Sequence, residues 1–489
     1  MKVLLLNTPD LHVGKTTSDW DLDATDIGVF PPVGLMFLAA SVRASGKHQV
    51  KIVDTILNKM NAQDVAREVE EWKPDVVGIT VYTPTLYDTF LVCREVRKVA
   101  PQTPIVWGGP HTWEFPEESI IHKEIVDYVI VGEAEESFTK FLDTLEDGGS
   151  LDDIAGLFYR KPDKSIFRSQ KAGYTQNLDS LPFPAFDLLD YNRYYSAMGT
   201  GAAVGTICSS RGCPFKCTYC VVPFKTYRSR SVENIVEEIQ LYRSHGVKEF
   251  FFFDDLFNAN VRRFKAISEG IIAAGITDIT WAFRGRVDAI NDECLVLAKK
   301  AGLRRIFFGV EDATDEGLVK IKKRITIEKV RRSLALCRKH GILTSTNWII
   351  GFPHHEKRED ILHLIDTAVD LNSDYAQFNI CIAYNDTDIW RQGVEKGLFP
   401  ADYWKNFALD PTPSLQEPIW DEHMSREELS ELLRLCYNKF YFRPGPIIKK
   451  LFAMQSFGEF WLHVKGAFTL LGFGGYRRSE HETPTTAQK

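Results

Sequence analysis

The cysteine spacing between residues 213 and 220 constrains this chain more than any other feature. The segment CSSRGCPFKCTYC places Cys213, Cys217 and Cys220 within eight residues, in the spacing CxxxCxxC. Three thiolates this close together can hold one compact inorganic cluster, and iron–sulfur clusters are usually held by four Cys. Three protein ligands on a four-iron cluster would leave one iron open to a substrate or cofactor.

The residues around these thiols favour metal binding. Gly212 and Pro214 indicate a tight loop, and Arg211 and Lys216 add positive charge that favours thiolates. A zinc site is the main alternative, but zinc sites usually combine two CxxC-type pairs at a distance, and this sequence has no second pair. The remaining alternative is three buried structural cysteines.

The spacing, Tyr219 before the last cysteine and the strand-like VGTIC before the loop resemble the radical S-adenosylmethionine (SAM) superfamily. The resemblance implies a [4Fe-4S] cluster whose open iron binds SAM. It implies that an electron from the cluster cleaves SAM to a radical that abstracts hydrogen from carbon. It also implies anaerobic chemistry and an electron donor such as flavodoxin or ferredoxin.

Length and composition indicate an ordinary globular protein. A chain of 489 residues predicts two or three domains, and a net charge of −7 argues against nucleic acid as a partner. Three clustered and six scattered cysteines fit a reducing, cytoplasmic setting. The opening MKVLLLNTPD is typical of a first strand, not of a signal peptide, and no stretch reaches the roughly 18 apolar residues needed to span a bilayer.

Residues 1–145 alternate short apolar runs with helical patterns, which predicts an α/β domain with a doubly wound, Rossmann-like parallel sheet. KVLLLN, VKIVDT, DVVGITVY, PIVWGG and YVIVGE are the expected strands. Ligands of such sheets bind at the carboxyl ends of the strands. Neither GxGxxG nor a Walker A motif is present, which argues against the usual nucleotide-binding modes.

Three motifs of this domain, PPVGLMFLAA, GGPHTWEFPEE and VGEAEES, resemble the cobalamin-binding domain that precedes many radical SAM cores. The DxHxxG motif that supplies a histidine to cobalt elsewhere is absent, so the lower ligand of cobalt stays open. The alternative is a flavodoxin-like domain without a cofactor. The resemblance implies cobalamin contacts from Asn7, Thr8, Pro9, Gly34, Thr80, Gly108, Gly109, His111, Gly132 and Glu133.

Residues 146–200 are expected to form a linker with a hairpin and a proline-rich segment, LPFPAFDLL. Residues 201–400 repeat strand and helix, which predicts a partial (β/α)6 TIM-like barrel with its function at the strand carboxyl ends. The resemblance implies SAM contacts from Tyr219, Asp254, Arg286, Glu311 and Asn347, with Glu311 at the ribose hydroxyls. The alternative for each charged residue is an ion pair inside the barrel mouth.

Two features of the barrel depart from or limit the resemblance. Relatives often end the sixth strand in a PGT-like turn, whereas this chain has Asn385, Asp386 and Thr387. Cys208 and the scattered cysteines are expected in the core, so auxiliary clusters and a methylthiotransferase are disfavoured. The pattern identifies no catalytic acid or base on the substrate side.

Residues 401–476 predict a helical C-terminal domain with Ser425 as an N-cap, and residues 477–489 a disordered tail. The amphipathic segment before that tail has two alternatives: peripheral contact with the inner membrane surface, or a cap on the barrel mouth that lines an apolar pocket.

Together these patterns predict a cobalamin-dependent radical SAM methyltransferase that transfers a methyl group from SAM to an unactivated carbon. The expected substrate is a hydrophobic small molecule such as a lipid, isoprenoid or tetrapyrrole. Two alternatives remain: a non-methylating cyclase or ring-forming relative, such as the anaerobic magnesium-protoporphyrin monomethyl ester cyclase, and a non-catalytic cobalamin or redox sensor.

Overall fold

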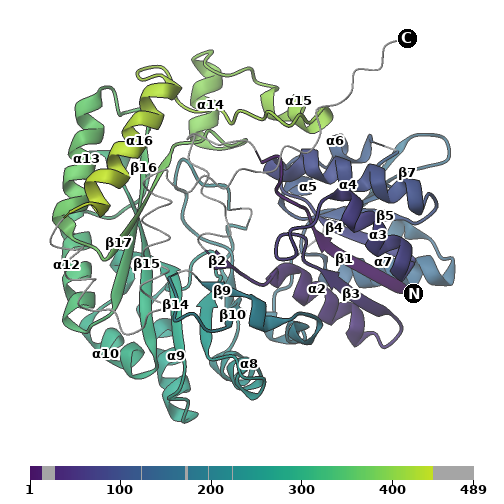
Figure 1. Ribbon diagram of the computed structural model, residues 1–489, viewed down its shortest axis with the longest axis horizontal. Coiled ribbons are helices and arrows are strands. Elements are labelled where there is room, and N and C mark those ends of the chain that lie inside the picture. The colour runs from purple at the N-terminus through teal and green to yellow at the C-terminus, as the bar shows by residue number, and fades with distance from the viewer. Residues whose placement is uncertain (14–27, 123, 171–173, 197, 223, 444–489) are drawn as a thin grey trace.

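Two α/β lobes lie side by side in this computed structural model (Figure 1), which describes residues 1–13, 28–122, 124–170, 174–196, 198–222 and 224–443. The N-terminal lobe is purple to blue, and the second lobe is teal to green. The predicted fold class is confirmed: a Rossmann-like domain, a partial barrel and C-terminal helices.

The first lobe is built on a seven-stranded sheet in the order β3-β1-β4-β5-β6-β7-β8. Its first five strands are parallel, and the β7–β8 hairpin, which falls in the expected linker, adds an antiparallel edge. Apolar runs form these strands because helices cover the sheet. The strands are β1 (Lys2–Asn7), β3 (Gln49–Val53), β4 (Val76–Thr80), β5 (Ile105–Gly108), β6 (Tyr128–Ile130), β7 (Leu157–Arg160) and β8 (Ile166–Arg168).

The helices of this lobe pack in pairs, α2 (Val33–Ala44) beside α7 (Ala134–Asp147) and α3 (Ala62–Trp72) beside α4 (Leu86–Val99). Asn61 begins α3 with a capping box, in which its side chain accepts from Asp64. Two short helices, α5 (Pro110–Glu114) and α6 (Pro116–Ile120), follow β5.

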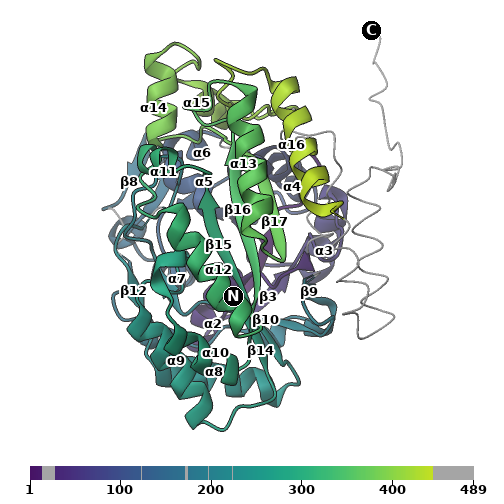
Figure 2. The ribbon, with the colours of Figure 1, turned by 90° about the vertical axis from the view of Figure 1, so that its left-hand side faces the viewer.

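The second lobe is a six-stranded parallel sheet whose strands follow chain order. Figure 2 shows its helices on the outer side. The strands are β10 (Val204–Ile207), β13 (Glu249–Phe252), β14 (Thr280–Gly285), β15 (Leu303–Glu311), β16 (Leu343–Ile350) and β17 (Tyr375–Ile380). The helices are α8 (Val232–Ser244), α9 (Val261–Ala273), α10 (Asp292–Lys300), α11 (Asp315–Lys320), α12 (Ile327–Lys339) and α13 (Arg358–Leu371).

C-terminal helices join the lobes. Within α15 (Tyr403–Leu409), the Lys405 ammonium lies 3.3 Å from Glu118, and His122 bonds to the Ala408 carbonyl at 3.2 Å (Figure 1). Helix α14 (Asp388–Glu395) precedes α15, and α16 (Arg426–Tyr441) begins at the expected N-cap, Ser425. The predicted amphipathic segment after α16 and the disordered tail lie outside the described residues.

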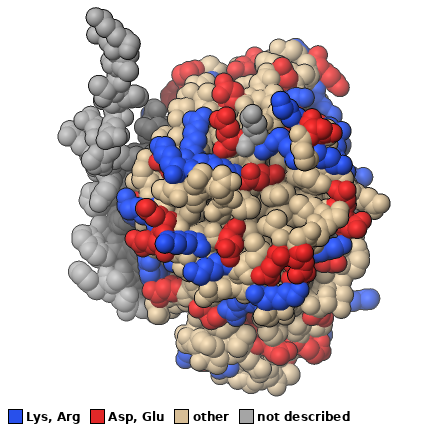
Figure 3. All heavy atoms as spheres, turned by 90° about the vertical axis from the view of Figure 1, so that its right-hand side faces the viewer, with Lys and Arg blue, Asp and Glu red and all other residues tan. Residues whose placement is uncertain are grey.

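Two short ribbons complete the fold: β2 (Gly28–Val29) with β9 (Tyr195–Ser196), and β11 (Ser210–Arg211) with β12 (Arg228–Ser229). The first ties the N-terminal lobe to the linker, and the second frames the cysteine loop. On the face in Figure 3, Lys and Arg are interspersed with Asp and Glu. No helix in the described parts of the chain is long and apolar enough to cross a membrane.

Candidate active site

The cysteine motif forms a loop between β11 and β12. Cys213, Cys217 and Cys220 are partly buried free thiols. Gly212 opens the loop at a φ of +86°, and a Cβ there would lie 2.3 Å from the Thr226 carbonyl oxygen, so the turn requires glycine. The Cys213 amide closes the loop by donating to the Phe224 carbonyl at 2.9 Å. Three thiols on one tight loop are the donor set of an iron–sulfur cluster.

The charge around these thiols differs from the sequence expectation. Burial raises the pKa of Cys213 and raises that of Cys220 to about 11, opposed in both by Lys225. Arg211 instead turns to the first lobe, 2.6 Å from Glu135. The expectation that Arg211 favours thiolates was therefore wrong. Iron itself must stabilise the thiolate form.

Glu311, at the end of β15, lies in a buried charged cluster with two partners. Lys323 donates to its carboxylate at 2.9 Å and lies 3.3 Å from the Tyr219 hydroxyl. A Cβ at Gly309 would lie 2.4 Å from the Glu311 carboxylate, so that glycine makes room for the pair. Burial and the charge of Glu311 raise the pKa of Tyr219, which stays a neutral phenol. Lys323 was not predicted, because the run KIKKR does not single it out.

The other predicted SAM residues differ in how their polar atoms are used. Asp254 accepts from the Ser209 amide at 2.7 Å and from the Ser209 hydroxyl at 2.6 Å. Arg286 pairs with Asp288 at 2.9 Å and lies over the Phe215 ring at 3.8 Å. By contrast, the buried Oδ1 of Asn347 has no hydrogen-bond partner. Asn347 thus offers a ligand an unused acceptor, whereas Asp254 and Arg286 already bond within the fold.

A cavity of about 350 Å³ lies between the lobes. Its first wall includes α2 and the carboxyl ends of β4, β5 and β6. The opposite wall comes from the barrel lobe and includes Cys208, Arg211, Phe224, Phe253 and Asp255. The predicted cobalamin residues that line the cavity are Gly34, Thr80, Gly108, Gly109, Gly132 and Glu133.

The remaining cobalamin candidates do not line this cavity. Asn7 donates to Asp54 at 2.9 Å, and the Thr8 hydroxyl donates to the Thr80 carbonyl at 3.1 Å; Pro9 is buried beside them. His111 is buried, and its Nδ1 lies 3.0 Å from the Thr83 hydroxyl. Burial lowers the pKa of His111 to about 3, so its ring stays neutral. Its Nε2 has no hydrogen-bond partner.

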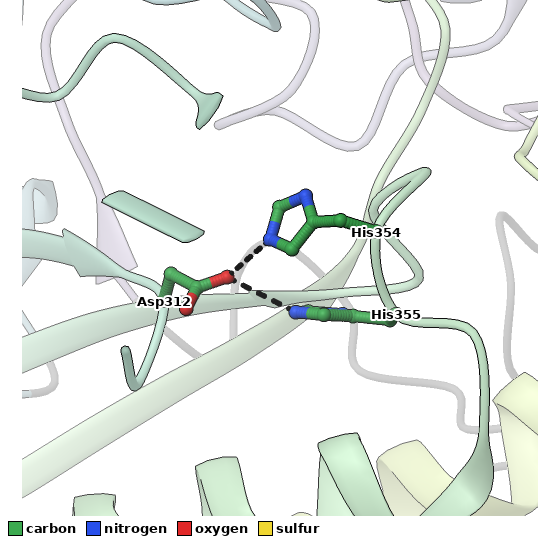
Figure 4. Close-up of side chains that lie close together, drawn as sticks. All are labelled: Asp312, His354 and His355. Atoms are coloured by element: carbon green, nitrogen blue, oxygen red, sulfur yellow. Dashed lines mark hydrogen bonds and ion pairs between the residues drawn. The ribbon is translucent and has the colours of Figure 1, made fainter. Parts of the chain in front are cut away.

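A second cluster, Asp312 with His354 and His355, follows directly on Glu311 (Figure 4). The Asp312 carboxylate accepts from His354 Nε2 at 2.7 Å and from His355 Nε2 at 3.0 Å. His355 Nδ1 accepts from the Phe352 amide at 3.3 Å, so the proton of this ring is on Nε2. A protonated Nε2 is no metal ligand. The two histidines instead attach the loop after β16 to Asp312, the residue that follows Glu311.

Comparisons with known proteins agree with this geometry. Residues 207–368 match the radical SAM superfamily, and residues 21–142 match the B12 binding domain. An uncharacterized methyltransferase of Pyrococcus horikoshii is 34% identical over 87% of this chain and 91% of that protein. The anaerobic magnesium-protoporphyrin IX monomethyl ester cyclase of Rubrivivax gelatinosus is 27% identical over 90% of this chain and 77% of that protein.

Two further comparisons cover less of this chain. Hopanoid C-3 methylase of Methylococcus capsulatus is 31% identical over 68% of this chain and 63% of that protein. The solved structure of TsrM from Kitasatospora setae, a radical SAM methyltransferase with cobalamin and a [4Fe-4S] cluster, has a TM-score of 0.64 at 18% identity and covers 81% of this chain and 75% of that one. At this identity the likeness shows a shared fold.

A B12 binding domain followed by a three-cysteine barrel defines a radical SAM enzyme with cobalamin as a second cofactor. The chain belongs to the cobalamin-dependent radical SAM family. Its cofactors are a [4Fe-4S] cluster, SAM and cobalamin. The residues fit these groups: free thiols on one loop, an unused acceptor at Asn347, and a cavity wall that includes glycines at the strand ends, where a large ring can approach the backbone.

Proposed function

We propose that this enzyme transfers a methyl group from SAM, by way of cobalamin, to an unactivated carbon of an organic substrate. The observation that carries the proposal is the cavity with one wall from each lobe. Methyl transfer to a carbon radical requires the corrin and the SAM site to face each other across the substrate. A cavity bounded by the strand ends of the B12 domain and by the residues flanking the cysteine loop meets that requirement.

In the barrel, we assign the cluster to Cys213, Cys217 and Cys220. Glu311 accepts hydrogen bonds from the SAM ribose hydroxyls while Lys323 fixes its carboxylate. Asn347 supplies a further acceptor. The remaining predicted SAM residues, Tyr219, Asp254 and Arg286, brace the walls of the site.

In the first lobe, Gly34, Thr80, Gly108, Gly109 and Gly132 form the surface against which the corrin lies. Glu133 is held in place, because Arg228 donates to both of its carboxylate oxygens at 2.9 and 2.6 Å. When bound, the cluster supplies the electron that cleaves SAM, and cobalamin carries the methyl group. The chain binds and orients these cofactors and the substrate, and it excludes water from the site.

A ring-forming oxidation is the second candidate, because the cyclase of Rubrivivax gelatinosus aligns with 90% of this chain. The methyltransferase and hopanoid methylase relatives favour methyl transfer. We propose an organic substrate with a large apolar part, in keeping with the lipid, isoprenoid and tetrapyrrole classes expected from the sequence.

Anaerobic incubation of the reconstituted full chain with methyl-labelled SAM and a one-electron reductant tests the proposal without knowledge of the substrate. We expect 5′-deoxyadenosine to form and label to move to the protein-bound cobalamin. Deoxyadenosine without label on cobalamin would support the ring-forming class. Neither product would support a sensor and overturn the proposal.

A further inference from the structure

The inner face of the barrel sheet leaves side chains accessible. On β14, on β17 and in the second half of β16, buried residues alternate with less buried ones. Phe283 packs against Phe257 and Phe264 on the helix side of the sheet, so its neighbour Arg284 points to the opposite side. That opposite side is the lumen of the barrel.

The strand registers arrange the lumen residues in layers. Arg284 pairs with Phe307, and Phe307 pairs with Ser345 on the next strand. One layer nearer to the strand ends, Asn347 pairs with Gly309 on one side and with Gln377 on the other. Because paired residues of parallel strands share a face, these side chains lie in the same lumen.

Arg284 faces the lumen and has no acidic partner among the residues that the structure describes. Its guanidinium makes no hydrogen bond or ion pair with any residue that the structure describes, whereas Arg286, two residues on, is paired with Asp288. Desolvation by the surrounding protein lowers the pKa of Arg284, and no charged neighbour contributes to this shift. The side chain of Arg284 is nevertheless exposed. Arg284 is therefore an accessible cation that no described residue neutralises.

The walls around this cation are apolar and aromatic on one side and carry amides on the other. The guanidinium carbon lies 5.4 Å from the ring centroids of both Phe251 and Phe253. Gln377 is exposed across the lumen, and the Asn347 oxygen has no partner. Phe253 also lines the cavity between the lobes, so the two hollows are adjacent.

We propose that Arg284 binds an anionic group of the substrate, a carboxylate or phosphonate, while the apolar body of the substrate lies against Phe251 and Phe253. This inference rests on the proposed function and narrows its substrate to an amphiphilic organic anion. A planar guanidinium recognises both oxyanion groups through paired hydrogen bonds. The exposed amide of Gln377 can add a donor.

The alternative partner is the carboxylate of SAM, and the SAM affinity of Arg284→Gln distinguishes the two partners. Arg284 is level with Phe307, four residues before Glu311 on β15. At about 3.3 Å per residue, Phe307 lies roughly 13 Å along β15 from the proposed ribose contact at Glu311, and Arg284 itself is the penultimate residue of β14.

The test measures binding of phenylphosphonate, an aromatic anion, to the reconstituted full chain by calorimetry. We expect binding to weaken at least ten-fold in Arg284→Gln and to recover in part in Arg284→Lys. Arg262→Gln is the matched control, since Arg262 is an exposed arginine on the outer helix α9, and its affinity for phenylphosphonate should equal that of the wild type.

Three outcomes would overturn the proposal: no binding by the wild type, equal weakening in Arg262→Gln, or a loss of SAM affinity in Arg284→Gln that matches the loss for phenylphosphonate. Deoxyadenosine formation and label transfer to cobalamin by the wild type, measured in the same preparation, report separately on the proposed function. Failure of anion binding with those activities intact would overturn only the role of Arg284.

Discussion

Two parallel sheets face each other across the cavity, and their edges are built from different residues. The edge of the B12 domain offers several glycines, among them Gly108, Gly109 and Gly132. The edge of the barrel offers charged side chains, with Glu311 and Lys323 paired at 2.9 Å. A large ring needs close approach to a smooth backbone, whereas a small charged ligand needs fixed polar atoms. Both sheets therefore bind a ligand at the carboxyl ends of their strands, and the residue types at those ends determine which ligand each sheet binds.

Buried ion pairs join the two edges. Arg211 and Arg228, on the ribbon that frames the cysteine loop, both reach Glu133 of the first lobe, at 3.4 and 2.6 Å. Breaking such a pair leaves an uncompensated buried charge, so these contacts hold the two edges in one relative position.

The largest effect is expected from a substitution in the cysteine loop of the barrel, which should abolish deoxyadenosine formation. Cys217→Ala removes one of three thiolates from the proposed cluster, so deoxyadenosine formation should fall to background while cobalamin stays bound. Iron content and product chromatography measure this. Cys208→Ser, between β10 and β11, is the matched control and should keep its iron. Retained deoxyadenosine formation in Cys217→Ala would refute the cluster assignment.

The next largest effect is expected from a substitution in the B12 domain that alters cobalamin binding alone. Gly34 lines the cavity, and a Cβ there meets no atom within 4 Å, so Gly34→Leu projects into the cavity without a clash in the fold. We expect at least ten-fold weaker cobalamin binding, read from corrin absorbance after dialysis, with deoxyadenosine formation intact. Gly34→Ala is the graded control, since it adds helix propensity with little bulk. Equal cobalamin content in Gly34→Leu would show that the ring lies elsewhere.

A smaller effect is expected from one charge of the barrel edge. Glu311→Gln removes the charge-assisted acceptor proposed for the ribose and leaves Lys323 unpaired. SAM affinity should fall about ten-fold, or about 1.4 kcal/mol, in equilibrium dialysis. Glu328→Gln, on the exposed face of α12, should leave the affinity unchanged. An unchanged affinity in Glu311→Gln would refute the ribose assignment.

The last effect is on stability rather than on ligand binding, and it concerns the joint between the lobes. Burial raises the pKa of Glu114, on α5 of the first lobe, to about 7, with Asp386 adding to the rise and a bond from Asn385 opposing it. The folded state therefore binds more protons than the unfolded state between pH 4.5 and about 7, and stability falls as the pH rises through that window.

Glu114→Gln should remove this fall, on the order of 2 kcal/mol at pH 8, in urea unfolding at pH 5 and pH 8. Glu117→Gln, which alters an exposed surface pair with Arg168, is the control and should keep the wild-type pH profile. If Glu114→Gln also keeps that profile, the raised pKa of Glu114 does not contribute to stability.

Much of the fold followed from local patterns in the sequence. In the first lobe, continuous apolar runs predicted the parallel strands, because helices cover that sheet and make alternation unnecessary. Polar residues at strand ends predicted where ligands bind. Charge partners could not be predicted in this way. Arg211 lies beside Cys213 in sequence but pairs with Glu135 of the other lobe, and Lys323 reaches Glu311 across a whole helix.

By itself, the sequence determined the cysteine loop and the order of the two domains, since both depend on the spacing and type of neighbouring residues. Only the tertiary structure decided which polar groups remain free for ligands. Asp254 and Arg286 bond within the fold, whereas Arg284 and the Asn347 oxygen do not. The physical reason is that a long charged side chain can reach several different partners. Strand register and the packing of the lobes determine which partners lie within its reach.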